Sequence, residues 1–244
     1  MSTKPVNVSQ KIMRGQLEVA CFNAESARRA VAAGAHRIEL CVDRASGGVT
    51  PSLELLKDLR SQVPANLAIN VMIRPRGEDF TYDEEELQEM ASSIEAMKPH
   101  CNGFVFGILN ADKTVDVDAC KKLVDLADPM PCTFHRAFDD ALDLFQALED
   151  VMVCGFKTIL TSGGPGNAVD NLIMLSRLLA AARGRIIIMP GGGLRVQEMI
   201  NLQRNKVKPY WYHTSGIIGE GELADEMELT VARFQAEGDQ EAFE

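Results

Sequence analysis

The chain has 244 residues, of which 46% are hydrophobic and 25% are charged. This is enough to bury one α/β domain or two small ones, and it excludes a disordered or collagen-like chain. The 25 basic and 35 acidic side chains give a net charge of −10, which predicts no binding to nucleic acid or to anionic membrane surfaces.

Targeting segments and disulfide bonds are not expected. The first fourteen residues lack the apolar run of a signal peptide, and no later stretch is long enough to span a bilayer, so we expect an intracellular protein. Six cysteines are too few for a disulfide scaffold in a chain of this length, and none lies in a CxxC arrangement. We therefore expect reduced thiols and no zinc finger.

Eight short apolar runs have the composition of β-strands, and segments with helical spacing separate them. The predicted strands cover 16–22, 37–42, 68–74, 103–109, 130–138, 157–162, 185–190 and 209–214. The predicted helices cover 24–33, 53–59, 83–97, 116–126, 142–152, 169–182, 196–203 and 223–236. Asn23 before the first helix and Gly155 after the fifth are residues that favour helix ends.

This eightfold alternation, with no linker to divide it, predicts an α/β protein with a single-domain TIM (β/α)8 barrel. A doubly wound open sheet is the alternative, but no glycine-rich dinucleotide turn follows the first strand. We expect the barrel over 15–236, a flexible segment over 1–14 and an acidic tail over 237–244.

Charged residues interrupt strands that should be apolar throughout. Glu18, Glu39, Arg74 and Arg76, His135 and Arg136, and His213 lie within predicted strands or just beyond their ends. Because inward side chains at the carboxyl ends of barrel strands surround the mouth, these groups are candidates for one site. In that site Glu18, Glu39, His135 and His213 are the candidate catalytic groups. The alternative is a buried ionic plug, in which the two glutamates only neutralise Arg74 and Arg76.

Two glycine turns follow the sixth and seventh strands. Thr161, Ser162 and Gly163 form the first, and Gly191, Gly192 and Gly193 form the second. Loops after the late strands of barrels commonly bind phosphate through exposed backbone N–H groups. Together with Arg74, Arg76 and Arg136 they predict a site for a small anionic ligand, although a tight turn alone would also explain the glycines.

Several of these segments resemble the CutC family of copper homeostasis proteins. The resemblance runs from about residue 16 to 215, and it is carried by RIELC at 37–41, GGVTPS at 47–52, IRPRG at 73–77, TFHRAFD at 133–139, LTSG at 160–163 and MPGGG at 189–193. It implies a (β/α)8 barrel, cytoplasmic and homo-oligomeric, that binds or traffics Cu(I).

The resemblance also suggests a copper ligand. In eukaryotic relatives the proposed Cu(I) site uses a cysteine in each of the first two strands, which suits a soft ion. Cys41 matches the second position, whereas Ala20 occupies the first and Cys21 follows it. A one-residue offset turns a strand side chain to the other face, so Cys21 is expected to point away from Cys41.

Two functions therefore stay open. The first is copper homeostasis with Cu(I) held at Cys41. The second is a TIM-barrel enzyme in which the arginines and glycine turns bind a small, possibly phosphorylated, anionic metabolite and Glu18, Glu39 or His135 moves a proton. A barrel that serves only as a scaffold is a third reading.

Overall fold

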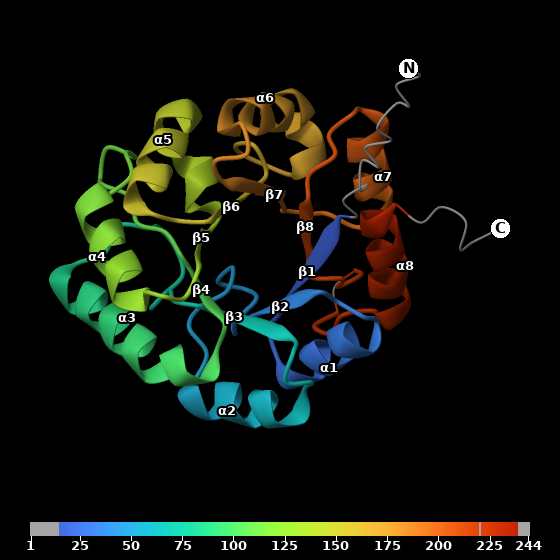
Figure 1. Cartoon of the computed structure of the whole chain (residues 1–244), viewed down its shortest axis with the longest axis horizontal. Helices are drawn as coiled ribbons and strands as arrows, with labels where there is room; N and C mark the ends of the chain where they lie inside the picture. Colours follow the sequence, from blue (N-terminus) through green and yellow to red (C-terminus); the bar gives the residue numbers. More distant parts are fainter. Residues whose placement is uncertain (1–14, 220, 239–244) are drawn as a thin grey trace, which may run out of the picture.

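Eight parallel strands form one sheet in the order β7-β6-β5-β4-β3-β2-β1-β8. The edge strands β7 and β8 lie side by side, so the sheet is a nearly closed barrel (Figure 1). The computed structural model describes residues 15–219 and 221–238. The predicted (β/α)8 barrel is confirmed, and its strands are β1 (Gln16–Cys21), β2 (Arg37–Leu40), β3 (Ala68–Met72), β4 (Gly103–Phe106), β5 (Cys132–Phe134), β6 (Thr158–Thr161), β7 (Ile187–Pro190) and β8 (Trp211–Thr214).

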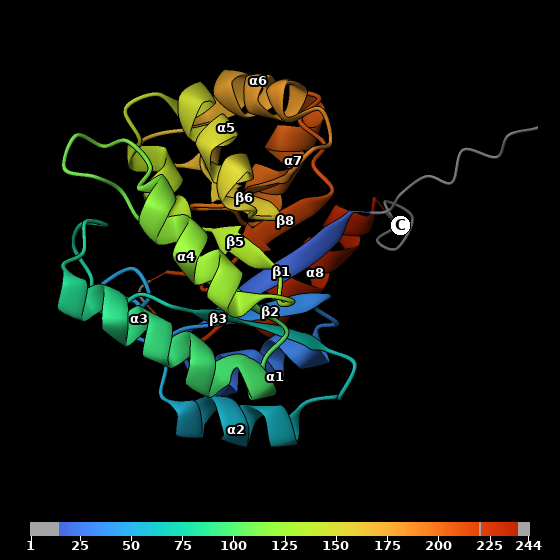
Figure 2. The same ribbon diagram turned by 60° about the vertical axis from the view of Figure 1, so that its left-hand side comes forward.

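An α-helix follows each strand and lies outside the ring of strands (Figures 1 and 2). Asn23 caps the first helix by accepting a hydrogen bond from the Ser26 N–H at 2.8 Å, and Gly155 ends the fifth helix with φ of +97°. The helices are α1 (Ala24–Ala32), α2 (Leu53–Gln62), α3 (Glu84–Met97), α4 (Val117–Ala127), α5 (Leu144–Cys154), α6 (Leu172–Ala182), α7 (Val196–Arg204) and α8 (Glu226–Glu237), with short 3-10 turns η1 (Lys98–His100), η2 (Arg136–Asp140) and η3 (Ala168–Asn171).

The strands are shorter than the apolar runs that predicted them. The clearest case is β5, which ends at Phe134 rather than at residue 138. There the His135 imidazole accepts the N–H of Ala137 and begins η2, so the chain leaves the sheet. The expected flexible segment at 1–14 and all but the first two residues of the expected acidic tail lie outside the described residues.

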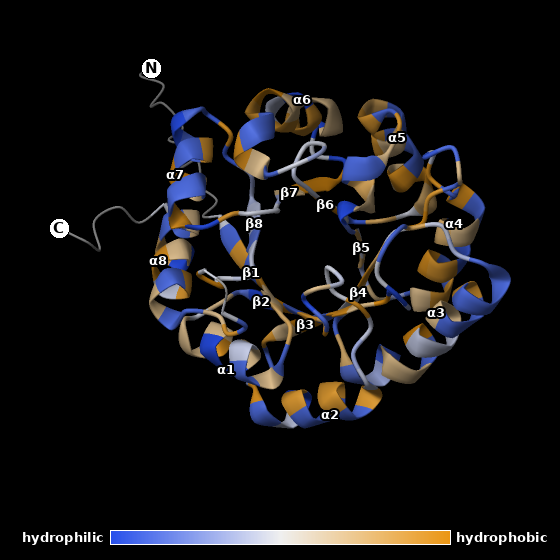
Figure 3. Ribbon diagram, turned by 180° about the vertical axis from the view of Figure 1, so that it is seen from behind, coloured by the Kyte–Doolittle hydropathy of each residue, from blue (hydrophilic) through white to orange (hydrophobic). Residues whose placement is uncertain are grey.

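Side chains of the strands alternate between two apolar layers. In β1, Leu17, Val19 and Cys21 point outward into the main core between strands and helices. The barrel interior holds two smaller clusters, Cys41 with Met72 and Val105, and Leu160 with Met189 and Trp211. Figure 3 shows hydrophobic and hydrophilic residues alternating along the helices, as expected for helices with one buried face. Within the described residues, every helix is too short or too polar to cross a bilayer.

Candidate functional site at the mouth of the barrel

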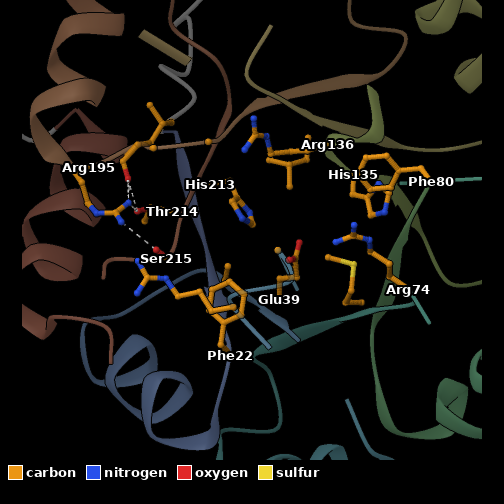
Figure 4. A pocket seen from close by; sticks show the side chains of 18 residues that line it. Phe22, Glu39, Arg74, Phe80, His135, Arg136, Arg195, His213, Thr214 and Ser215 are labelled. Atoms are coloured by element: carbon orange, nitrogen blue, oxygen red, sulfur yellow. Dashed lines mark hydrogen bonds between the residues drawn. The ribbon is translucent and has the colours of Figure 1, made fainter. Parts of the chain in front are cut away.

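A cavity of about 210 Å³ opens at the carboxyl ends of the strands. Seven of the sequence-predicted site residues line it, namely Glu39, Arg74, His135, Arg136, Gly192, Gly193 and His213. Figure 4 shows Glu39 and His213 facing each other in this cavity, with Arg74 and His135 on one side and Arg195, Thr214 and Ser215 on the other. The barrel topology thus brings together charges that are up to 174 positions apart in the sequence, from Glu39 to His213.

Glu18 lies one layer below this cavity and is fully buried. One carboxylate oxygen accepts a hydrogen bond from the Arg37 guanidinium, and the other lies 2.9 Å from His213 Nδ1. Burial alone would raise the pKa of Glu18, but Arg37 and then His213 outweigh it and hold the pKa at about 2. Glu18 is therefore a fixed negative charge that orients the His213 ring.

Glu39 and His213 form a titratable pair above Glu18. Glu39 is 3% exposed, and its Oε2 atom has no hydrogen-bond partner among the described residues. Burial raises the pKa of Glu39 to about 7, an effect that His213 partly offsets and Glu18 reinforces. Burial would lower the pKa of His213, but the carboxylates of Glu39 and Glu18 outweigh it and raise that pKa. The site thus places an imidazole whose protonated form is favoured beside a carboxyl group whose pKa of about 7 lets it gain or lose a proton near neutral pH.

His135 is a neutral hydrogen-bond donor in the same cavity. Its Nδ1 atom accepts the Ala137 N–H at 3.3 Å, which assigns the ring proton to Nε2. Burial lowers the pKa of His135 to about 3, and the positive charge of Arg74 adds to this. The Nε2 atom is buried and has no partner among the described residues. The ring packs against Phe80 with centroids 4.9 Å apart.

Arg74 is held at the mouth by backbone carbonyl groups. Its guanidinium donates to the carbonyls of Ser46 at 2.8 Å, Gly48 at 3.2 Å and Glu78 at 3.1 Å, and it stacks on Phe80 at 4.7 Å. Among the described residues no carboxylate forms a salt bridge with it. The side chain is 5% exposed, so it places an unneutralised positive charge beside the cavity.

Arg76 lies outside the cavity, although it was expected beside Arg74. Its guanidinium bonds Glu86 Oε1 at 2.5 Å and Asp79 at 3.0 Å, and it stacks on Tyr82. The expectation assumed strand alternation through residue 76, but β3 ends at Met72 and the chain turns away. The ionic plug is not formed either, because Glu18 pairs with Arg37 and no arginine in the described part of the chain forms a salt bridge with Glu39.

Thr161 and Ser162 also differ from their expected role as ligand-binding groups. Both side-chain hydroxyls donate to Asp139, which is 4% exposed, and the Gly163 N–H donates to Thr161 Oγ1 at 2.8 Å. The same carboxylate accepts the Arg136 Nε at 2.9 Å. This turn therefore fixes Arg136 at the mouth rather than presenting its own donors to a ligand.

The second glycine turn reaches the cavity with two of its three residues. Gly192 and Gly193 line it with φ of +85° and +72°. A Cβ atom on Gly192 would lie 2.9 Å from the Arg136 guanidinium carbon, so glycine is required for that close approach. Gly191 does not line the cavity, and a Cβ there would lie 2.4 Å from Leu160.

Four site residues were not predicted from the sequence. Arg37 begins β2, where a polar residue is ordinary, and Asp139 acts from η2 across to the loop after β6. Arg44 and Arg195 line the cavity from loops. Arg195 donates to the carbonyl of Ile217 at 2.9 Å and to Ser215 Oγ at 3.3 Å. The local signal in the sequence that could have identified Arg195 is its position just after the glycine turn, in Gly193-Leu194-Arg195.

The two cysteines of the first strands lie on opposite faces, as the one-residue offset predicted. Cys21 packs in the core between strands and helices, whereas Cys41 packs inside the barrel beside Met72. Cys41 is 1% exposed and does not itself line the cavity, but Met72 does. Burial raises the pKa of the Cys41 thiol well above its usual value, and Glu39 adds to this.

Three side chains near the mouth form a set of possible metal ligands. Glu18, Glu39 and His213 each offer one donor atom, and these atoms lie within 4.8 Å of one another. Carboxylate and imidazole donors suit divalent ions, whereas Cu(I) favours thiolate and thioether sulfur. Both oxygens of Glu18 are already engaged, so this set does not fit Cu(I). The fitting donors are the sulfur atoms of Cys41 and Met72.

Comparisons with known proteins agree on one family. A model of the CutC family matches residues 15–217. A human protein named copper homeostasis protein cutC homolog is 42% identical over 189 residues, covering 77% of this chain and 67% of that protein. A CutC family protein from Parabacteroides distasonis is 42% identical over 184 residues, covering 75% of each chain. A CutC crystal structure from Streptococcus agalactiae matches with a TM-score of 0.77 and 29% identity, covering 82% of this chain and 98% of that one.

Proposed function

The chain belongs to the CutC family of copper homeostasis proteins, and we propose that it acts in copper homeostasis by binding Cu(I) inside the mouth of its barrel. The observation that carries this proposal is the pairing of two sulfur side chains. Cys41 and Met72 pack in one small cluster within the barrel, and Met72 borders the open cavity. A thiolate and a thioether together suit a soft monovalent ion.

The Cys41 thiol must lose its proton to bind the ion. Because burial holds its pKa high, copper would displace a proton, and the affinity would depend on pH. Ala20 stands where a second interior thiol would complete a two-thiolate site, so one thiolate contributes to the proposed site.

The test is a Cu(I) titration of the purified protein with a competing chromophoric chelator. We expect Cys41→Ala to weaken binding by at least about tenfold, or ~1.4 kcal/mol. Cys21→Ala is the matched control, since it removes an equally buried thiol from the opposite face of the strands. Met72→Leu keeps the volume but removes the sulfur, and it should also weaken binding. Equal affinity in the wild type and in Cys41→Ala would overturn the proposed site.

We also propose that the protein works in a reducing compartment, as the cytoplasmic expectation requires. All six cysteines are free and buried, which is usual where disulfides do not form. Fractionation of cells that express a tagged chain tests this, and recovery from an oxidising compartment would contradict it.

A further inference from the structure

The cavity at the mouth carries a positive charge that a copper site does not require. Four arginines and two histidines line it, against the single carboxylate of Glu39. This local excess stands out in a chain whose net charge is −10. A cleft lined by one sign of charge concentrates ligands of the opposite sign. The charge of this lining alone therefore favours a small anion over a bare cation.

Three residues that line the cavity, Glu39, Arg74 and His135, each have one buried polar atom without a hydrogen-bond partner among the described residues, and for Arg74 that atom is Nε. The other two atoms are Glu39 Oε2 and His135 Nε2. Leaving such an atom unsatisfied costs about 1–3 kcal/mol. Glu39 Oε2 is an acceptor and His135 Nε2 is a donor, so a ligand with a hydrogen to give and an oxygen to receive would satisfy both. No lysine is among the described residues that line the cavity, so a Schiff base has no nucleophile there.

The surroundings of Glu39 also suit proton transfer. His213 faces it (Figure 4) and is oriented through Nδ1 by Glu18, which Arg37 holds in turn. The other ring nitrogen of His213, Nε2, has no hydrogen-bond partner within residues 15–219 and 221–238 and can contact a ligand. Glu39 and His213 thus form an acid and base pair in one small space, and Glu18 and Arg37 act as positioning residues.

We infer that the barrel mouth is a catalytic site that moves a proton on a small metabolite bearing a carbonyl and one carboxylate or phosphate group. The Glu39 carboxylate takes the proton from the carbon beside the carbonyl, and the C–H electron pair forms an enolate. The enolate oxygen accepts a hydrogen bond from His135 Nε2–H. The His213 imidazolium returns a proton to the enolate, and a proton from Glu39 then restores His213. Electrons and atoms balance as an isomerisation or racemisation, with no oxidant, reductant or second substrate.

The ligand's anionic group is assigned to the arginine side of the cavity. The guanidinium of Arg74 is anchored by carbonyl groups and Arg136 is anchored by Asp139, so both are fixed before a ligand binds. At about 210 Å³ the cavity is smaller than the ~300 Å³ at which pockets for drug-sized ligands begin. The metabolite is therefore a short-chain compound.

The experiment follows exchange of the carbon-bound proton with solvent. The full chain in D₂O, with a metal chelator present, is incubated with 2-oxobutyrate as the carboxylate probe and with dihydroxyacetone phosphate and ribulose 5-phosphate as the phosphate probes. Proton NMR measures loss of the signal beside the carbonyl against protein-free buffer. Because the chelator removes copper, the result is independent of the Cu(I) titration.

We expect proton exchange in one of the two probe series, at a rate that is lower by about 100-fold or more in Glu39→Gln. Arg74→Gln should raise KM for the same probe. Arg76→Gln is the matched control, since Arg76 pairs with Glu86 outside the cavity, and it should behave as the wild type. Circular dichroism checks that each variant is folded. Should Glu39→Gln not fold, competitive inhibition of the wild type by inorganic phosphate or acetate replaces it as the test. No exchange with either series, a wild-type rate in Glu39→Gln, or no inhibition by either anion overturns the inference.

Discussion

The contact between Arg37 and Glu18 yields the prediction that the structure supports most directly. The Glu18 carboxylate is fully buried, and the side chain of Arg37 is 13% exposed. Replacing Arg37 by methionine keeps an unbranched apolar side chain but removes the positive charge and the guanidinium that stacks on Trp211. We expect Arg37→Met to leave a buried carboxylate with His213 as its main remaining charged partner, which destabilises the fold.

The magnitude follows from the pKa of Glu18. Burial opposes ionisation, yet Arg37 and His213 lower the pKa from its usual 4.5 to about 2. One pKa unit corresponds to ~1.4 kcal/mol, so the net effect of burial and of these partners stabilises the fold with ionised Glu18 by about 3 to 4 kcal/mol. Arg37 is the largest favourable cause. Breaking a buried ion pair by removing one partner typically costs about 3–5 kcal/mol. We therefore expect a loss of about 3 kcal/mol in the free energy of unfolding at pH 7.

The sign of the pH dependence is fixed by the lowered pKa. The contribution of Glu18 is fully present above pH 4.5 and is lost as the pH falls toward 2. The difference between wild type and variant should therefore be largest at pH 5 to 7 and shrink at pH 3. Trp211 is the sole tryptophan of the chain and lies 4.0 Å from the Arg37 guanidinium carbon, so its fluorescence reports urea unfolding.

The matched control is Arg76→Met. Arg76 forms its ion pairs at the surface, where its side chain is 36% exposed, and such pairs contribute about 0–1 kcal/mol. A loss for Arg37→Met no greater than that of Arg76→Met, or a loss that does not change between pH 7 and pH 3, would refute the reasoning.

Three further changes test the rest of the site. Asp139→Asn should lower the free energy of unfolding by about 2–4 kcal/mol, because it removes a buried carboxylate that accepts several hydrogen bonds. The control Asp140→Asn changes a half-exposed carboxylate and should lower that free energy by less than about 1 kcal/mol, as measured by chemical denaturation. Gly192→Ala should lower the melting temperature more than Gly184→Ala, although both glycines have positive φ. The methyl group added at Gly192 would lie 2.9 Å from the Arg136 guanidinium carbon, whereas nothing lies within 4 Å of the one added at Gly184. Equal shifts in melting temperature would contradict the close contact at Gly192. Cu(I) affinity should rise by about tenfold per pH unit from pH 6 to 8, because one proton of Cys41 is displaced, and a flat profile would exclude that thiol as the ligand.

The fold could be predicted from the sequence because local and long-range signals agree. Each apolar run of strand length is followed by a segment with helical spacing, and residues such as Asn23 and Gly155 mark the ends of the helices. Strand ends were less predictable. The periodicity of residues 130–138 gave no sign that the His135 imidazole would bond the Ala137 N–H and end β5. The expected homo-oligomer stays a prediction.

Strand alternation accounts for part of the predicted site, and the position just after a strand accounts for Arg74, His135 and Arg136. Glu39 and His213 lie in regular strands, and both line the cavity as their inward positions implied. Arg76 lies four residues beyond the end of β3, where alternation no longer applies. The partner of Thr161 and Ser162 was not predictable from spacing, because Asp139 reaches them from a separate turn. Contacts of this kind depend on tertiary packing and leave no periodic signal.

The charges inside the barrel differ with depth, and this difference decides what the mouth can bind. Below the cavity the negative charge of Glu18 is offset by Arg37, so little of it reaches a ligand. Around the cavity Glu39 stands alone against the surrounding arginines, and its pKa of about 7 lets it become neutral. When Glu39 is protonated, the mouth has no negative charge to hold a cation. A metal ion would then have to be held by sulfur, which acts through covalency rather than through charge, whereas the proposed anionic ligand would be attracted by the charge of the arginines.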